Sequence, residues 1–301
     1  MEANKSKFQF HEHPWLAMII MLVVWIFIII LVIVGANQVG VPGNVPWRAL
    51  VTPGLAHVLV LFIIVPFALK LPSGKQSFRE YLTDIRLMNI KPFFPLLILG
   101  LSCSLIALLA LATQSVAFRY SQGLPVSLDF LRGMIPVKND LPPSPGYITT
   151  LPCIFEEIAW RGVMLVLFTR KYSDRKSILV TALGFSLLHL LNLLFGVDPA
   201  FVLRQVIFSF GTGVFYGVLV LRTKSLLPAM LHHYLVNMFI GSFTSYLQRH
   251  APDSTQILYL LINIPFTTFL LITWAKFYTQ KWLSSSQVLS AGGNHLALEQ
   301  Q

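Results

Sequence analysis

The chain has few charged residues and few cysteines. Charged side chains make up 11% of its 301 residues and hydrophobic residues 55%, whereas soluble domains carry about 25% charged residues. A chain this apolar would aggregate in water, so we expect lipid to be its solvent. The two cysteines, Cys103 and Cys153, fall in or beside apolar runs, which argues against a disulfide framework and against a thiolate metal site.

Long apolar runs recur along the chain and predict an all-α, polytopic membrane protein with about eight transmembrane helices. A helix crosses about 30 Å of hydrocarbon with about 20 residues. The run at 54–70 is short and contains Pro66, and the run at 148–168 is the least apolar. The eight runs are 16–36, 54–70, 93–113, 148–168, 177–196, 201–221, 226–246 and 256–275.

The placement of Lys and Arg supports this count. With eight spans, fifteen of the 22 basic residues fall on the side of the two termini, six fall on the other side, and only Arg161 remains within a span. Because basic residues favour the cytoplasmic side, both termini are predicted to be cytoplasmic. The net charge of +10 then reflects topology and contact with the lipid bilayer. A nucleic-acid partner is not expected, since no basic stripe is interleaved with aromatic residues.

Acidic residues are almost absent from the predicted spans. Only Glu156 and Glu157 of the twelve lie within one, and a charge in mid-bilayer costs about 3 kcal/mol or more, so such residues usually face a partner or a wet cavity. Glu157 and Arg161 are four residues apart on one helix face, which favours an ion pair. Glu156 is rotated by about 100° from Glu157. The spacing predicts a structural Glu157 and a working Glu156, with a purely structural polar cluster as the alternative.

Two later spans carry candidate partners for Glu156. His189 follows Phe185 by four residues, and His233 and Asn237 are four apart on one face. At about 1.5 Å per residue from the predicted cytoplasmic ends, Glu156 and His189 lie about 18 Å deep, and His233 and Asn237 about 10–17 Å. We therefore expect these four groups to converge.

Two further histidines in the spans are set aside. His232 points about 100° away from the face that His233 and Asn237 share. His57 lies near the start of its span and has no matching motif. We expect an interfacial or structural role for His57 and no role in the site for His232.

The converging groups suit the hydrolysis of an amide. A carboxylate among apolar walls is suited to act as a general base near neutral pH, so Glu156 would take a proton from water that His189 orients. His233 and Asn237 would stabilise the resulting oxyanion. Arg161, paired to the second glutamate, would hold the carboxylate pair rigid.

A zinc-dependent version is the alternative. Glu156, Glu157, His189 and His233 are plausible zinc ligands, but an arginine committed to one glutamate argues against both acids binding a dication. We expect no cofactor and no metal. Other intramembrane proteases match poorly, because the chain lacks H-E-x-x-H, a pair of intramembrane aspartates and G-x-S-G.

Three motifs together resemble a known family. Glu156-Glu157-x-x-x-Arg161, Phe185-x-x-x-His189 and His233-x-x-x-Asn237 occur in this order, and "FGTGVFYGVLVLRTKSLLPAML" precedes the last of them. This pattern resembles the CPBP family of intramembrane proteases, which contains the CAAX prenyl endopeptidases and the bacteriocin-processing or immunity (Abi) proteins. The resemblance covers about 155–240 and implies an eight-span glutamate-type protease, with Glu156 and His189 as the water-activating pair and His233 and Asn237 at the oxyanion.

The resemblance divides the chain into three segments. Residues 1–145 are predicted to form N-terminal transmembrane helices and loops, 146–250 the catalytic helical core, and 251–301 the last transmembrane helix and a disordered tail. The implied partner is a membrane-associated substrate, either a prenylated CAAX-like protein or a peptide precursor. A non-catalytic immunity or binding protein, and a proton-coupled transporter using Glu156 and His189, remain alternative functions.

Overall fold

All regular elements in the described part of the chain are helices. The computed structural model describes residues 9–40, 54–74, 77–135 and 150–283. The predicted disordered tail lies outside these residues, as does 136–149. The long helices are α1 (Pro14–Gln38), Gly54–Leu69 with its π-helical part η2 (Val60–Leu69), α4 (Phe93–Ser121), the continuous run of α7 (Pro152–Glu157), η4 (Ile158–Met164) and α8 (Leu165–Thr169), α9 (Asp174–Leu188) with η5 (His189–Phe195), α10 (Pro199–Thr223), α11 (Leu227–His250) and α12 (Asp253–Tyr278) with η6 (Thr279–Leu283). The short helices are η1 (Phe10–Glu12), α3 (Phe78–Asp84) and α5 (Leu128–Arg132).

The all-α, polytopic membrane class is confirmed. Among the described residues, five helices are long and apolar enough to cross a membrane, and Gly54–Leu69 is a shorter apolar helix. The exact count of eight stays a prediction. Two predicted spans outside the five, 148–168 and 226–246, carry five of the six predicted site residues, and His189 lies in Asp174–Phe195. The five are Pro14–Gln38, Phe93–Ser121, Asp174–Phe195, Pro199–Thr223 and Asp253–Leu283.

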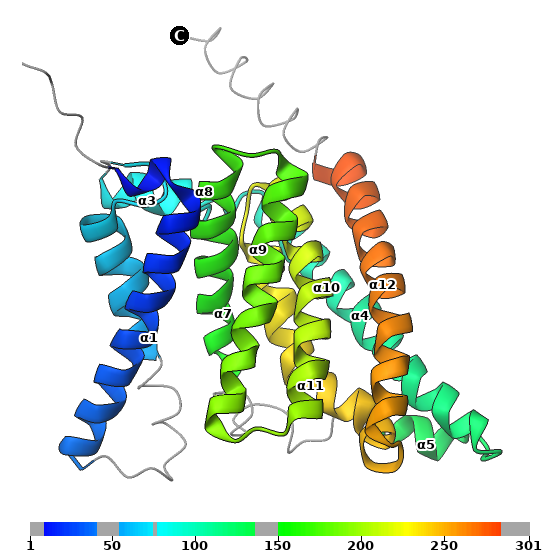
Figure 1. The fold of residues 1–301 in the computed structure, drawn as a ribbon. Helices are drawn as coiled ribbons and strands as arrows, with labels where there is room; N and C mark the ends of the chain where they lie inside the picture. The colour runs from blue at the N-terminus through cyan, green and yellow to red at the C-terminus, as the bar shows by residue number, and fades with distance from the viewer. Residues whose placement is uncertain (1–8, 41–53, 75–76, 136–149, 284–301) are drawn as a thin grey trace, which may run out of the picture.

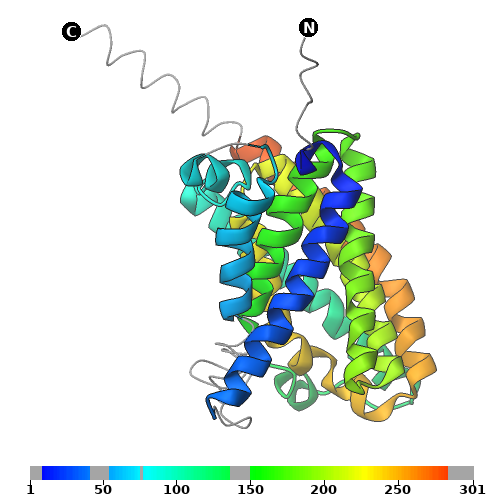
Figure 2. The ribbon, with the colours of Figure 1, turned by 60° about the vertical axis from the view of Figure 1, so that its left-hand side comes forward.

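The long helices run in alternating directions between the two ends of a bundle (Figure 1). The N-terminal end of α1 and the C-terminal end of α12 lie at the same end, and a second view shows the same arrangement (Figure 2). α3 lies at this end and α5 at the opposite one. The two termini of the described bundle are thus on one side, and the assignment of that side to the cytoplasm stays a prediction.

Local sequence signals fix the helix ends near the site. Ser173 caps α9, its hydroxyl accepting from the Lys176 amide. Gly196, at a φ of +75°, ends η5 in the left-handed region that glycine adopts freely. Asp198 then caps α10 by accepting from the Phe201 amide at 2.8 Å. The chain therefore turns from η5 into α10 within a few residues.

The basic connection before α4 is partly helical, since its stretch "FREYLTDIRL" contains α3. Tyr81 of α3 is fully buried, and its hydroxyl donates to the Leu61 carbonyl at 2.5 Å. Leu61 lies in η2, and in a π-helix its carbonyl would accept from the residue five further on. That residue is Pro66, which has no N–H. Tyr81 thus supplies the donor that the proline lacks, and burial raises the pKa of its phenol.

Small residues let α10 approach α9 closely. A Cβ at Gly213 would meet the Ala182 Cβ at 3.1 Å, and one at Gly217 would meet Ile178 Cγ1 at 3.0 Å. The two glycines, four residues apart in α10, therefore serve helix packing. It also brings the end of α9 close to the residues of η4.

One large hydrophobic core runs through the molecule from Ala17 in α1 to Leu283 in η6. The three predicted segments all contribute to it. Trp160, Val163 and Met164 of η4 are fully buried in this core. The run from α7 to α8 therefore lies inside the bundle, where its acidic and basic residues meet side chains of α9, α10 and α11.

Candidate functional site

Glu157 is the centre of a buried ionic cluster. Its Oε1 accepts from Arg161 Nη1 at 3.1 Å and lies 2.8 Å from His233 Nδ1. Glu157 is 0% exposed, and Arg161 and His233 are also buried. A carboxylate only accepts hydrogen bonds, so His233 Nδ1 carries a proton towards an ionised Glu157. The arginine on the same helix and the histidine on α11 thus fix this acid in place.

Two aromatic rings enclose the Arg161 guanidinium. Its central carbon lies 4.5 Å from the centroid of Phe185 and 5.0 Å from that of Tyr216. A Cβ at Gly213 would lie 3.1 Å from Arg161 Nη2, so the glycine also makes room for this side chain. Cation–π contacts gain strength in desolvated surroundings. The cluster joins η4 to both α9 and α10.

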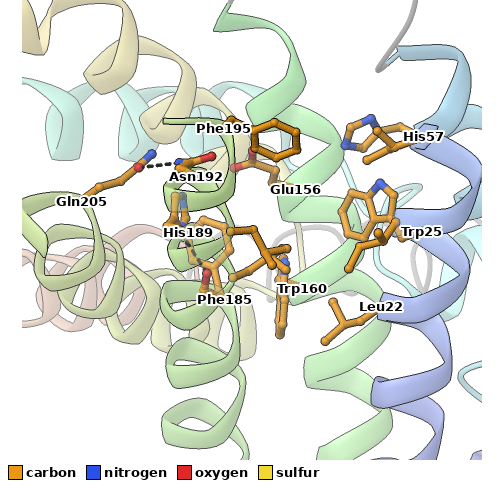
Figure 3. A pocket seen from close by; sticks show the side chains of 14 residues that line it. Leu22, Trp25, His57, Glu156, Trp160, Phe185, His189, Asn192, Phe195 and Gln205 are labelled. Atoms are coloured by element: carbon orange, nitrogen blue, oxygen red, sulfur yellow. Dashed lines mark hydrogen bonds between the residues drawn. The ribbon is translucent and has the colours of Figure 1, made fainter. Parts of the chain in front are cut away.

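Glu156 faces a cavity of about 390 Å³ (Figure 3), which we call the first cavity. Its side chain is 32% exposed, and its Oε2 lies 3.9 Å from His233 Nε2. In the view of Figure 3, Glu156 lies between His57 and Trp25 on one side and His189 and Asn192 on the other. The 100° rotation expected between the two glutamates is seen here, since one is buried and paired while its neighbour lines the cavity.

His189 lines the first cavity together with Glu156. It lies where α9 tightens into the 3-10 helix η5. Its Nδ1 lies 3.0 Å from the Phe185 carbonyl, which can only accept, so Nδ1 bears the hydrogen and Nε2 of the neutral ring is an acceptor. The Phe185 ring lies 5.0 Å from the His189 ring in an edge-to-face arrangement. One residue therefore positions both Arg161 and His189.

Asn237 is placed apart from the other predicted residues. It lines a separate cavity of about 350 Å³ between α4, α10, α11 and α12, which we call the second cavity. Four residues correspond to about 400° of helix rotation, so Asn237 is about 40° round from His233. His233 points back to Glu157, whereas Asn237 is exposed to the second cavity. The structure thus brings together Glu156, Glu157, Arg161, His189 and His233 and leaves Asn237 in the neighbouring cavity.

The two histidines set aside by the sequence have defined positions. His57 is 6% exposed, lines the first cavity, and packs edge-on against Trp25 at 4.8 Å. His232 is fully buried, and its Nδ1 lies 3.0 Å from the Tyr216 hydroxyl. His232 supports the Tyr216 ring, which packs against Arg161. His57 belongs to the wall of the first cavity, a position that the sequence did not indicate because no motif surrounds this histidine.

Sequence reasoning missed one residue that both cavities share. Gln205 of α10 lines the first and the second cavity. Its Oε1 accepts from Asn192 Nδ2 at 2.8 Å (Figure 3). The signal was present, since Gln205 is a polar residue within the predicted span 201–221. It belongs to none of the three motifs, so it drew no attention.

The side chains of the site do not form a metal-binding group. Among the described residues, no group of three or more His, Cys, Asp or Glu side chains is arranged to hold a metal ion. Glu157 Oε1 already binds Arg161 and His233. The expectation of a metal-free site stays a prediction.

The fold and the buried ionic cluster define a polytopic helical membrane protein with polar groups enclosed by its helices. Comparison with known families then specifies it: residues 142–239 match the family described as type II CAAX prenyl endopeptidase Rce1-like. This match of residues 142–239 agrees with the resemblance to the CPBP/CAAX protease family that the three motifs suggested. This match spans 98 of the 301 residues and includes all six predicted site residues. No curated protein and no solved structure matches the chain.

Proposed function

We propose that this chain is an intramembrane endopeptidase that hydrolyses a peptide bond of a membrane-associated substrate with water activated at Glu156 and His189. One observation carries the proposal: Glu156 and His189 line one cavity, while Glu157 is held behind it by Arg161 and His233. Of the two adjacent acids, only Glu156 is open to a substrate. The match of residues 142–239 to a protease family supports the general activity.

The water-activating pair works as follows. Glu156 takes one proton from water, and the neutral His189 ring accepts a hydrogen bond from the same water at Nε2, because its Nδ1–H is engaged by the Phe185 carbonyl. The water oxygen attacks the substrate carbonyl carbon. The proton held by Glu156 then passes to the nitrogen of the leaving amine as the C–N bond breaks.

The oxyanion is assigned to His233 and Asn237, as the family resemblance implies. His233 Nδ1 donates to Glu157, so its Nε2 becomes a donor only when the ring binds a second proton. Glu156 Oε2, 3.9 Å away, passes the proton taken from water to His233 Nε2 while the oxyanion exists. The same proton returns to Glu156 when the oxyanion collapses, and from there it passes to the leaving amine. Asn237 joins the site from the second cavity when a substrate connects the two cavities. Glu157 and Arg161 position His233 and do not touch the substrate.

The proposed substrate is a prenylated CAAX-like protein or a peptide precursor. Both classes bring an apolar group and a peptide bond to the membrane. The first cavity offers an apolar wall of Leu22, Ile26 and Ile29 beside Glu156, which supports a substrate of this mixed character.

Comparative proteomics of the membrane tests this function. Cells carrying the intact protein are compared with cells carrying Glu156→Gln, and C-terminal and precursor fragments are quantified. We expect a small set of cleavage products to vanish in Glu156→Gln. The matched control is Glu12→Gln, because Glu12 lies exposed in η1 and its substitution leaves the products unchanged.

The same strains separate the alternative functions. A binding or immunity protein keeps its phenotype in Glu156→Gln, and no fragment changes. A transporter shows proton-coupled flux in proteoliposomes, which a protease does not. Unchanged fragments at equal protein level in the membrane overturn the endopeptidase.

A further inference from the structure

The second cavity is lined by neutral amide side chains from four helices. Gln114 of α4, Gln205 of α10, Asn237 and Gln248 of α11, and Gln256 of α12 all line it. Each carboxamide is both a donor and an acceptor, as is a peptide group. Amides buried in an apolar bundle carry a desolvation cost unless they find partners. The lining therefore matches a ligand that has its own peptide groups.

One of these amides is a buried donor with no partner. The Gln114 side chain is 4% exposed, and its Nε2 has no hydrogen-bond partner among the described residues. A buried donor without a hydrogen bond is unfavourable, because it has lost its water partners and gained none. Gln114 lines the second cavity, so its Nε2 is a donor available to a bound carbonyl. Gln256, in contrast, already donates to the carbonyl of Ala251 at 2.8 Å.

The charges and the apolar wall of the second cavity restrict the class of ligand further. Among the described residues that line the second cavity, the ionic side chains are Arg204 and Asp253, and these pair with each other. Apart from this pair, the amides and Thr244, the wall is apolar and includes Phe208 and Ile240. A charged headgroup finds no unpaired partner there, and a bare hydrocarbon chain leaves the amides unsatisfied. An uncharged stretch of polypeptide satisfies both the amides and the apolar wall.

Among the described residues, the second cavity shares one lining residue with the first. Gln205 lines both, and it is held by the 2.8 Å hydrogen bond from Asn192, which lines only the first cavity. Figure 3 shows this bond beside His189. Breaking it frees both amides for a chain that passes from one cavity to the other.

We propose that the second cavity binds the uncharged polypeptide that flanks the scissile bond, with Gln114 as a main-chain hydrogen-bond donor and the Asn192–Gln205 contact as the partition that the bound chain opens. The proposal rests on the endopeptidase function above. It assigns a peptide-binding role to residues that lie outside the three motifs. It also explains how Asn237 reaches the substrate.

Photocrosslinking tests this binding without any cleavage. The full-length Glu156→Gln protein in detergent micelles is irradiated with an acetylated and amidated hexapeptide of Leu, Ala and Ser that carries a diazirine leucine. Mass spectrometry maps the adducts. We expect adducts on residues of the second cavity, such as Phe208 and Ile240. Gln114→Leu lowers the yield about fivefold, the effect of one lost hydrogen bond.

Two controls make the result decisive. Gln122→Leu removes an exposed amide just beyond the end of α4 and leaves the yield unchanged. Ile240→Trp fills the second cavity and lowers the yield by steric exclusion, so the proposal can be tested even if Gln114→Leu fails to fold. Adducts confined to the first cavity, or equal yields for folded Gln114→Leu and Gln122→Leu, overturn the proposal. So does displacement of the peptide by a diazirine fatty acid that labels the same residues.

The crosslinking experiment and the proteomics test the two proposals separately, so either proposal can fail without the other. Loss of the endopeptidase function with Gln114-dependent crosslinking intact leaves a peptide-binding cavity without cleavage. Glu156-dependent fragments without crosslinks in the second cavity leave a protease that binds its substrate elsewhere.

Discussion

His233 Nδ1 lies 2.8 Å from Glu157 Oε1, although 76 residues separate them in the chain. The contact joins α11 to the end of α7 and turns the opposite ring nitrogen towards Glu156. Arg161 holds the same carboxylate oxygen from its own helix. The acid next to the proposed base therefore serves to orient a histidine, and this division of roles underlies the first prediction.

Glu157→Gln is expected to destabilise the protein, whereas Glu156→Gln is not. Removing the buried carboxylate charge leaves Arg161, which is 2% exposed, without its counter-ion, at a cost of about 3–5 kcal/mol. Glu156 lines a cavity and accommodates the amide. Thermal unfolding in detergent measures both variants. Equal Tm values would show that the buried pair contributes nothing to stability.

Gly213→Ala is expected to lower stability by about 1–3 kcal/mol. The added methyl group would lie 3.1 Å from both Arg161 Nη2 and the Ala182 Cβ, so it pushes α10 from α9 and displaces the guanidinium. Gly35→Ala in α1 is the matched control, because no atom lies within 4 Å of its added Cβ. We expect the control to keep or raise its Tm, since alanine favours a helix. Similar losses for both variants would contradict the packing explanation.

Tyr81→Phe is expected to cost about 1–2 kcal/mol, because it leaves the buried Leu61 carbonyl without its donor. Tyr120→Phe serves as the control, as Tyr120 is 77% exposed. Chemical unfolding of the two variants in the same detergent compares them directly. If Tyr81→Phe left the free energy of unfolding unchanged, the Leu61 carbonyl would have found another donor.

Chelators are expected to leave cleavage unchanged. Glu157 Oε1 is committed to Arg161 and His233, so it is not available to a dication. Once a substrate is known from the proteomics, its cleavage is followed with and without 1,10-phenanthroline. Activity lost with the chelator and restored by added zinc would favour the zinc-dependent alternative.

Spacing and composition were sufficient for the class of fold and for part of the site. The lack of charge required lipid as solvent, and the four-residue spacing from Glu157 to Arg161 predicted a pair that the structure places at 3.1 Å. The 100° step between the adjacent glutamates predicted their different surroundings. These features follow from the geometry of a single helix, which the local sequence sets.

Contacts between helices were decided by the tertiary structure alone. The sequence put His233 and Asn237 on one face, but the packing of α11 aims one side chain at Glu157 and the other into the second cavity. Gln114 and Gln205 gained significance only when four helices enclosed them. The sequence alone determined which residues are polar and how they are spaced along each helix. Which of them meet depends on the rotation and offset of each helix against its neighbours, which side-chain packing fixes.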